Sequence, residues 1–259
     1  LSNTDYIGNT PYENWGIWNF NVFVNQRHFA FSLGLLMLTL LMLIPLVEKT
    51  PRRLKDTSKN RLHEFFLSAE GWAPENITRT IFIGLILGIS AYWNGAVLIS
   101  SISILFLMAF YSRHRIEYLN IAIIVFIMAY SQSIIFGGGD GTPLKLTFYT
   151  GFLSPSKDIS GIIMYYVELL GILPLILAAA FFIVPSAYRW MLVCFSAPFI
   201  MANLFIFTSD MVVNHKYINI SIILLGIFSA VLVTRLLKIK KFATTVVSIL
   251  LIVALTITG

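Results

Sequence analysis

The fold is decided by one long apolar stretch, TIFIGLILGISAYWNGAVLISSISILFLMAFY, which runs from Thr80 to Tyr111. As one straight helix this stretch would reach about 48 Å, whereas the hydrocarbon core of a bilayer is about 30 Å thick. Its middle, AYWNGA, interrupts the apolar pattern with an interface-preferring Tyr-Trp pair, an Asn and a Gly. The sequence therefore predicts a broken or re-entrant pair of helices with its turn near Trp93.

Apolar runs of membrane-spanning size recur on both sides of this stretch. The chain has 259 residues, of which 58% are hydrophobic and 12% charged, with a mean hydropathy of +0.83. This composition excludes a water-soluble globular enzyme. We predict an all-α polytopic transmembrane bundle of about eight hydrophobic segments, forming one membrane domain over residues 1–259. The other apolar runs are Phe29–Val47, Tyr118–Phe136, Ile162–Val184, Met191–Phe207, Tyr217–Leu237 and Phe242–Thr258.

The distribution of Lys and Arg tests the predicted turn independently, because a turn at Trp93 reverses the side of every later loop. With the turn, 14 of the 18 Lys and Arg lie on one face; without it, the split is 10 against 8. The turn is therefore favoured. It makes residues 48–79 a basic cytoplasmic loop and places both termini outside, as expected for a protein of the bacterial cytoplasmic membrane.

Several other functions are disfavoured by the residues present. The net charge of +6 comes from short clusters between apolar runs, so orientation in the membrane explains it better than nucleic-acid binding. The single cysteine, Cys194, excludes an internal disulfide and a Cys-based metal site. We expect no metal and no cofactor. Residues 1–27 are aromatic and polar without a signal-peptide pattern, which suggests a processed or truncated start or an internal boundary of a longer protein.

Polar residues gather on the predicted extracytoplasmic face, which includes segment 1–27 and a Gly-rich loop over 137–160. Two pairs of cationic or titratable residues lie there at the entrances of spans, where burial near hydrocarbon is costly. They are Arg27 with His28, and His215 with Lys216. A phosphate matches these donors, although lipid headgroups, local carboxylates or simple snorkelling anchors fit the same residues. The candidate site residues are Arg27, His28, Asn94, Asp140, Asp210, Asn214, His215 and Lys216.

Two further titratable residues have other interpretations. Glu168 lies inside an apolar run, so it is either a functional intramembrane carboxylate or a structural partner for a polar group on a neighbouring helix. His114 lies in a basic cytoplasmic loop, and we expect it to be solvated.

Several strings resemble the later membrane half of bacterial glycosyltransferase-like proteins of the GT-C superfamily. They are VNQRHFAFSLGLLML, GLILGISAYWNGAVLISS, YTGFLSPSKDISGIIMYYVELLGILPLIL and, most specifically, ANLFIFTSDMVVNHKYINISIILLGIFSAVLV. The resemblance implies a polyprenyl-phosphate sugar donor, an extracytoplasmic active site and inverting transfer. It also implies that Arg27, His28, His215 and Lys216 hold the lipid phosphate, with Asn94 near the sugar.

The resemblance does not identify the catalytic carboxylate, because the family carries it in a first extracytoplasmic loop that has no match here. A partner chain or a missing N-terminal portion would then supply the base. Among the residues present, Asp140 on its glycine turn is the first choice for acid-base or acceptor-positioning work, and Asp210 the second. Asp210 has the alternative role of orienting His215 or Lys216. Two rival functions are a transporter or flippase-like binder of anionic lipid and a non-catalytic subunit of a membrane complex.

Overall fold

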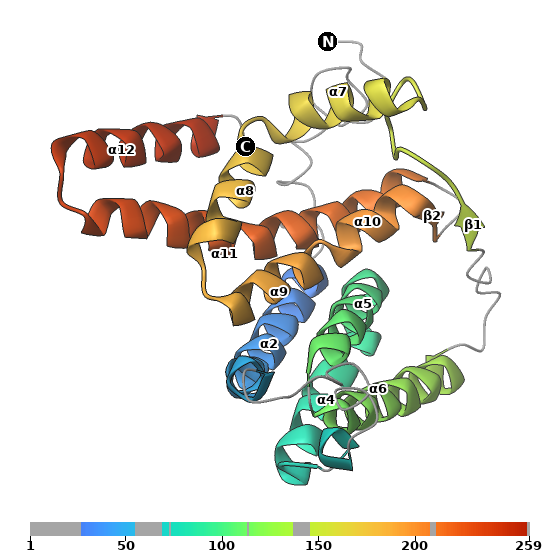
Figure 1. Ribbon diagram of the computed structural model, residues 1–259. Coiled ribbons are helices and arrows are strands. Elements are labelled where there is room, and N and C mark those ends of the chain that lie inside the picture. Colours follow the sequence, from blue (N-terminus) through green and yellow to red (C-terminus); the bar gives the residue numbers. More distant parts are fainter. Residues whose placement is uncertain are drawn as a thin grey trace.

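The computed structural model describes residues 27–54, 69–72, 74–112, 114–136, 146–207 and 211–257 (Figure 1). Over these residues the chain is mostly helical, with one short antiparallel pairing of β1 (Thr147–Phe148) with β2 (Phe205–Ile206) and with connecting turns and loops. Single-turn 3-10 helices cover Ala69–Trp72 (η1) and Met211–Asn214 (η2). The predicted all-α class is confirmed.

Three helices of the described part are long and apolar enough to cross a membrane. They are α2 (Arg27–Leu54), within which His28–Glu48 is the apolar section, α6 (Arg115–Phe136) and α11 (His215–Lys238). The structure therefore indicates a membrane protein. α2 continues to Leu54, so the first residues of the predicted 48–79 loop are helical instead.

The predicted break in the long apolar stretch is confirmed. α4 (Ile77–Trp93) ends and α5 (Gly95–Tyr111) begins on either side of Asn94, whose backbone is extended. The chain reverses direction there, because His114, just after α5, contacts Glu75, just before α4. Each helix has 17 residues, or about 25 Å, which is shorter than a full hydrocarbon core.

Two other apolar runs do not form the single spans that we predicted. Residues 162–184 divide into α7 (Ile159–Leu170) and α8 (Leu173–Ile183), which are bent by 84° relative to each other. Gly171, at φ 51, ends α7 in a backbone conformation that favours glycine.

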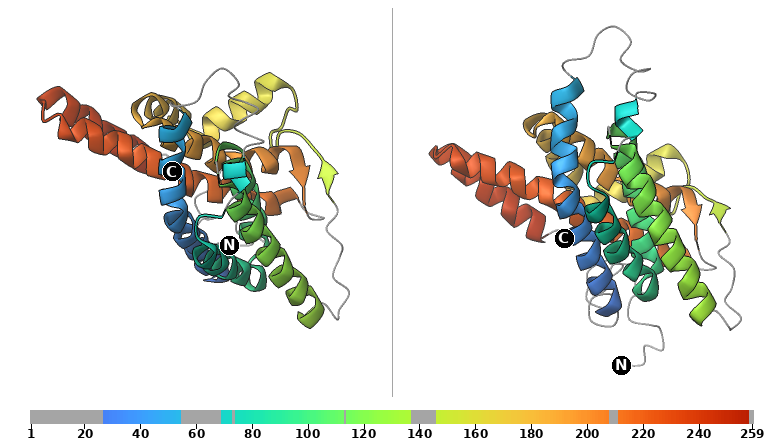
Figure 2. Two further views of the ribbon diagram at one scale, coloured as in Figure 1. Left: turned by 60° about the horizontal axis from the view of Figure 1, so that its bottom comes forward. Right: turned by 90° about the horizontal axis from the view of Figure 1, so that it is seen from below.

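Residues 191–207 divide as well, into part of α9 (Ser186–Phe195), α10 (Ala197–Leu204) and β2. Pro198 in the first turn of α10 has no N–H to continue a helix from α9. The last helix is α12 (Phe242–Ile257), which returns alongside α11 to form the projecting hairpin in Figures 1 and 2.

The closest helix packing in the described part joins α4 to α6. A Cβ built on Gly84 would lie 2.9 Å from the Cβ of Ile124, and one on Gly88 would lie 2.3 Å from Sδ of Met128. The residue numbers rise together along both helices, so α4 and α6 run parallel, with α2 on the other side of α4. Small residues at such a contact let two membrane helices approach closely.

We expect Gly84→Ala to lower the free energy of unfolding by about 1–3 kcal/mol, because Ile124 is branched at Cβ and cannot turn its methyl groups away. Gly34→Ala is the matched control. Gly34 is exposed within α2 and has no heavy atom within 4 Å of its ideal Cβ position, so alanine there adds helix propensity without a clash. Thermal unfolding of both variants in the same detergent measures the difference, and equal stabilities would contradict the close contact.

Candidate functional site

Three segments far apart in the sequence meet at one end of the bundle, here called the Asn94 end. The rings of Phe31, in the first turns of α2, and Trp93, at the end of α4, lie 5.1 Å apart. Ala96, in the first turn of α5, packs against the cluster that contains Tyr217 of α11. The start of α2, the α4–α5 turn and the start of α11 are therefore neighbours, which is the arrangement that the predicted site requires.

Asn94 has a defined structural task at this end. Its side-chain oxygen accepts hydrogen bonds from the backbone N–H groups of Ala96 and Val97, at 3.1 and 3.2 Å. Its own N–H donates to the carbonyl of Ser90. The buried side chain thus caps α5 while the backbone closes α4, which explains why the turn lies at this residue.

Asn214 ties the start of α11 to the end of α10. Its Nδ2 donates to the carbonyls of Ala202, at 3.0 Å, and Phe205, at 2.5 Å. The side chain is buried, and its Oδ1 has no hydrogen-bond partner in the part of the chain that the structure describes. Asn214 therefore keeps one acceptor that the surrounding protein leaves unused.

The cationic candidates differ in how far they are exposed. His28, in the first turn of α2, is exposed, His215 is buried, and Lys216 beside it is half-buried. Lys216 forms no ion pair with the described residues. The side chain of Arg27 and the whole of Asp140 and Asp210 lie outside the described residues.

The β1–β2 pairing anchors two loops side by side near α11. Thr147 pairs with Ile206, and Phe148 with Phe205. Thr147 follows Asp140 by seven positions in the sequence, and Ile206 precedes Asp210 by four. The two loops that carry the predicted carboxylates are therefore attached to the fold at adjacent points.

The later part of the predicted 137–160 loop, whose residues were not among the candidate site residues, lies against the end of α10. The N–H of Gly151 donates to the carbonyl of Asn203, and Nζ of Lys157 donates to the carbonyl of Phe152 at 2.8 Å. The ammonium of Lys157 also lies 4.7 Å from the ring centre of Tyr149. In the same loop, a hydrogen bond from Ser156 lowers the pKa of Asp158. The contact of Gly151 with Asn203, some fifty residues away, adds these residues to the candidate site.

Aromatic rings surround the start of α11 in the same region. Phe207 and Tyr217 have ring centres 4.7 Å apart, and Phe205 lies 6.3 Å from Phe207. The hydroxyl of Tyr166 donates to Oδ1 of Asn203 at 2.6 Å. Aromatic faces beside amide and ammonium groups give this end the amphipathic character of a binding surface.

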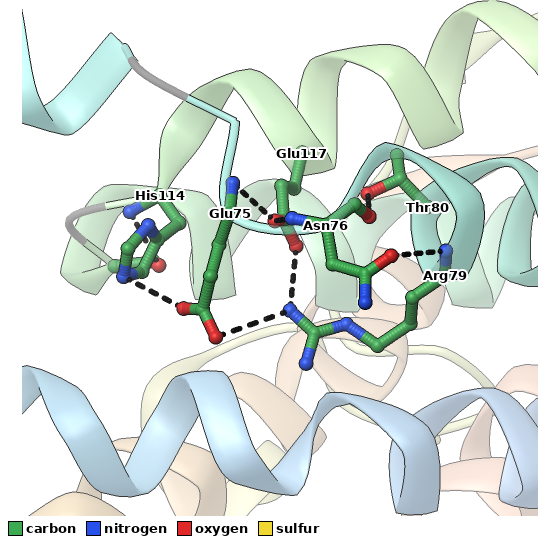
Figure 3. Close-up of polar contacts among 7 residues, drawn as sticks. Glu75, Asn76, Arg79, Thr80, His114 and Glu117 are labelled. Carbon is green, nitrogen blue, oxygen red and sulfur yellow. Dashed lines mark hydrogen bonds and ion pairs between the residues drawn. The ribbon is translucent and has the colours of Figure 1, made fainter.

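The opposite end of the bundle, here called the Arg189 end, holds a second polar cluster (Figure 3). Glu117 of α6 accepts hydrogen bonds from the N–H groups of Glu75 and Asn76, at 2.9 and 2.8 Å, and from Nη2 of Arg79 at 3.1 Å. Its side chain is only 1% exposed. The carboxylate therefore fastens the chain before α4 onto the start of α6.

His114 belongs to the same cluster, so the prediction that it is solvated is wrong. Its imidazole is buried, and Nε2 lies 3.3 Å from Oε2 of Glu75. Figure 3 shows the carboxylate of Glu75 between His114 and Arg79. The basic composition of the loop concealed these acidic partners, which come from the segment before α4.

Glu168 is exposed and has no polar partner in the described part of the chain. It lies on α7, exposed, and forms no hydrogen bond or ion pair with the described residues. The interpretation of Glu168 as a structural partner within this part of the chain is therefore wrong.

The described cations divide between the two ends. His28, Lys157 and Lys216 belong to the Asn94 end. The other end is defined by contacts of Tyr188 with Glu48 and of Trp190 with Tyr111. The cations of that end whose side chains the structure describes are Arg79, Arg115, Arg189, Arg235, Lys238, Lys240 and Lys241.

No group of three or more His, Cys, Asp or Glu residues in the described part could hold a metal ion. Comparison with known proteins adds no relative: no family model matches the chain, and neither a curated protein nor a solved structure shows significant similarity to it. The functional argument therefore rests on the residues and their positions.

Proposed function

We propose that the chain is a membrane glycosyltransferase of GT-C type, or its C-terminal membrane portion, which transfers a sugar from a polyprenyl-phosphate donor. The observation that supports this proposal most strongly is the meeting of three span entrances at the Asn94 end. It brings His28, Asn214, His215 and Lys216 to one end of the bundle, beside aromatic rings.

The residues at this end suit a lipid phosphate. Lys216 supplies a charge that the described residues do not neutralise, and Arg27 and His28 stand at the entrance of α2. Cations that hold the departing phosphate stabilise the charge that develops as the sugar leaves. The free acceptor on Asn214 is suited to a sugar hydroxyl, which donates a hydrogen bond.

A carboxylate must accept the proton of the acceptor hydroxyl, and we assign this role to Asp140, with Asp210 as the second choice. Both belong to loops whose anchor points are adjacent in the β1–β2 pairing. A partner chain or a preceding portion of the protein remains the alternative source of the base.

We further propose that the Asn94 end faces outward. Seven of the described Lys and Arg residues belong to the Arg189 end, which the positive-inside rule assigns to the cytoplasm. The eight hydrophobic segments would then be α2, α4, α5, α6, the pair α7–α8, the pair α9–α10, α11 and α12. Helices as short as α4, α5 and α12 need a thinner bilayer or deep interfacial anchoring. Both termini would lie outside, in a bacterial cytoplasmic membrane.

The test is a transfer assay with purified protein and radiolabelled polyprenyl-phosphate sugars, comparing the wild type with Asp140→Asn and Asp210→Asn. We expect the wild type to release labelled product and Asp140→Asn to lose about 10²-fold or more of this rate, since general base catalysis contributes about 10²–10⁴-fold. Asp210→Asn should lose less. Equal turnover by all three proteins would show that neither carboxylate takes part in catalysis. No turnover with any polyprenyl-phosphate sugar would contradict the proposed function.

A further inference from the structure

An apolar groove runs along the bundle toward the Arg189 end, away from the proposed active site. The groove has a volume of about 570 Å³. It lies between α2, α9 and α11 and is apolar except at one end, where Tyr188 and Arg235 line it. Representative apolar lining residues are Met37, Leu41, Ile44, Met191, Phe195 and Ile227.

Arg235 lines the polar end of this groove, and Arg189 binds the same short segment of chain, residues 182–184. Nη1 of Arg235 donates to the carbonyl of Ile183 at 2.7 Å. Arg189 donates through Nε to the carbonyl of Val184, at 3.1 Å, and through Nη2 to that of Phe182, at 3.2 Å. Because these three carbonyls are consecutive at the end of α8, the two guanidinium groups are held close to each other.

The positive charge of this pair is not neutralised by the described residues. Carbonyl groups at a helix C-terminus satisfy N–H donors but carry no full negative charge. Neither Arg189 nor Arg235 forms an ion pair within the described part. Glu48, which lies at this end of the bundle, accepts a hydrogen bond from Tyr188, a residue that lines the groove. Two cations with unused N–H groups therefore stand at the mouth of an apolar groove.

We propose that this groove binds a membrane lipid that carries an anionic phosphate headgroup. One acyl chain lies along α2 and α11, and the phosphate lies on Arg189 and Arg235. Guanidinium forks recognise phosphate oxygens well, and the apolar lining matches hydrocarbon. The groove follows α11 from Ile227 to Arg235, a length of about 12 Å. A volume of about 570 Å³ spread over this length makes the groove narrower than a helix of another protein, which is about 10–12 Å across with its side chains.

The headgroup is tested by native mass spectrometry of the full chain in detergent, with phosphatidylglycerol and phosphatidylcholine of identical acyl chains. We expect phosphatidylglycerol to bind about tenfold more tightly. The double variant Arg189→Gln/Arg235→Gln should lose this preference. Lys240→Gln/Lys241→Gln, which removes the same charge at the exposed turn before α12, should keep it. If both double variants lose this preference equally, the preference comes from the general positive charge of the surface, and the proposal is overturned.

The groove is tested separately by Leu41→Trp, which fills it, against Leu85→Trp on α4, which does not line it. We expect only Leu41→Trp to weaken phosphatidylglycerol binding, by about tenfold. Glycerol 3-phosphate should not compete; competition at the affinity of the lipid would indicate a site for soluble phosphate. If the mass spectra show a second copy of the chain bound in place of lipid, the groove is a protein interface and the proposal is wrong. If the arginine double variant does not fold, Arg189→Lys/Arg235→Lys keeps the charge, and loss of the fork should still reduce the preference.

Discussion

Lys216→Ala is expected to lower kcat/KM for a polyprenyl-phosphate sugar by about 10²–10³-fold, the range measured when one preorganised donor to a developing anion is removed. Lys216 is half-buried in the first turn of α11, beside His215 and the free acceptor of Asn214. A phosphate held there has little competition from water. Removal of the ammonium therefore leaves the departing phosphate without its counter-charge.

Lys238→Ala is the matched control, because it removes the same charge from the other end of α11, where the side chain is exposed. It should leave kcat/KM within about twofold, since exposed charges contribute little. Lys216→Arg should recover part of the rate. Steady-state transfer of radiolabel measures all three variants. An equal effect of Lys216→Ala and Lys238→Ala would show that Lys216 has no specific role in the transfer reaction.

Glu117→Ala is expected to lower the free energy of unfolding by about 3–5 kcal/mol, the usual result of removing one partner of a buried ion pair. The substitution leaves three donors without their acceptor: the N–H groups of Glu75 and Asn76 and the guanidinium of Arg79. All three belong to the chain that begins α4. We therefore expect α4 to separate from α6 early in unfolding.

Glu75→Gln is the control for this prediction. The side chain of Glu75 is 25% exposed, and its Oε1 lies 3.9 Å from Nη2 of Arg79. Glutamine keeps a polar group for the contact with His114, so the loss of the charge should cost about 1 kcal/mol or less. In the Glu117→Ala protein, Arg79→Met should restore part of the stability, because no buried charge then lacks a partner. Thermal unfolding in one detergent compares the four proteins, and equal effects of the two glutamate substitutions would disprove the role of Glu117.

Much of the α4–α5 region could be predicted from the sequence, because local chemistry determines it. An apolar run too long for one span, with Asn94 and Gly95 at its centre, provides both the need for a turn and a capping residue. The distribution of Lys and Arg then predicted which ends would lie together. The turn depends on residues that are adjacent in sequence, and the side of each loop depends only on a count of its Lys and Arg residues.

The bend after α7 and the division into α9 and α10 were not predicted, because an apolar pattern records burial in hydrocarbon but not the direction of the helix axis. The Glu117 cluster was missed for another reason. Its hydrogen-bond partners are about 40 positions away along the chain. Of the predicted site, His28, Asn94, Asn214, His215 and Lys216 lie at the Asn94 end, whereas the contacts of Arg27, Asp140 and Asp210 stay a prediction.

The parallel course of α4 and α6 has an electrostatic consequence. Two helices that start side by side concentrate the positive ends of their macrodipoles, about half an elementary charge each, and these ends repel each other. Glu117 supplies a negative group between the two starts, where water and salt scarcely reach it. An anion at this point is thus a condition for the parallel contact itself, which accounts for an acidic residue at the most basic end of the molecule.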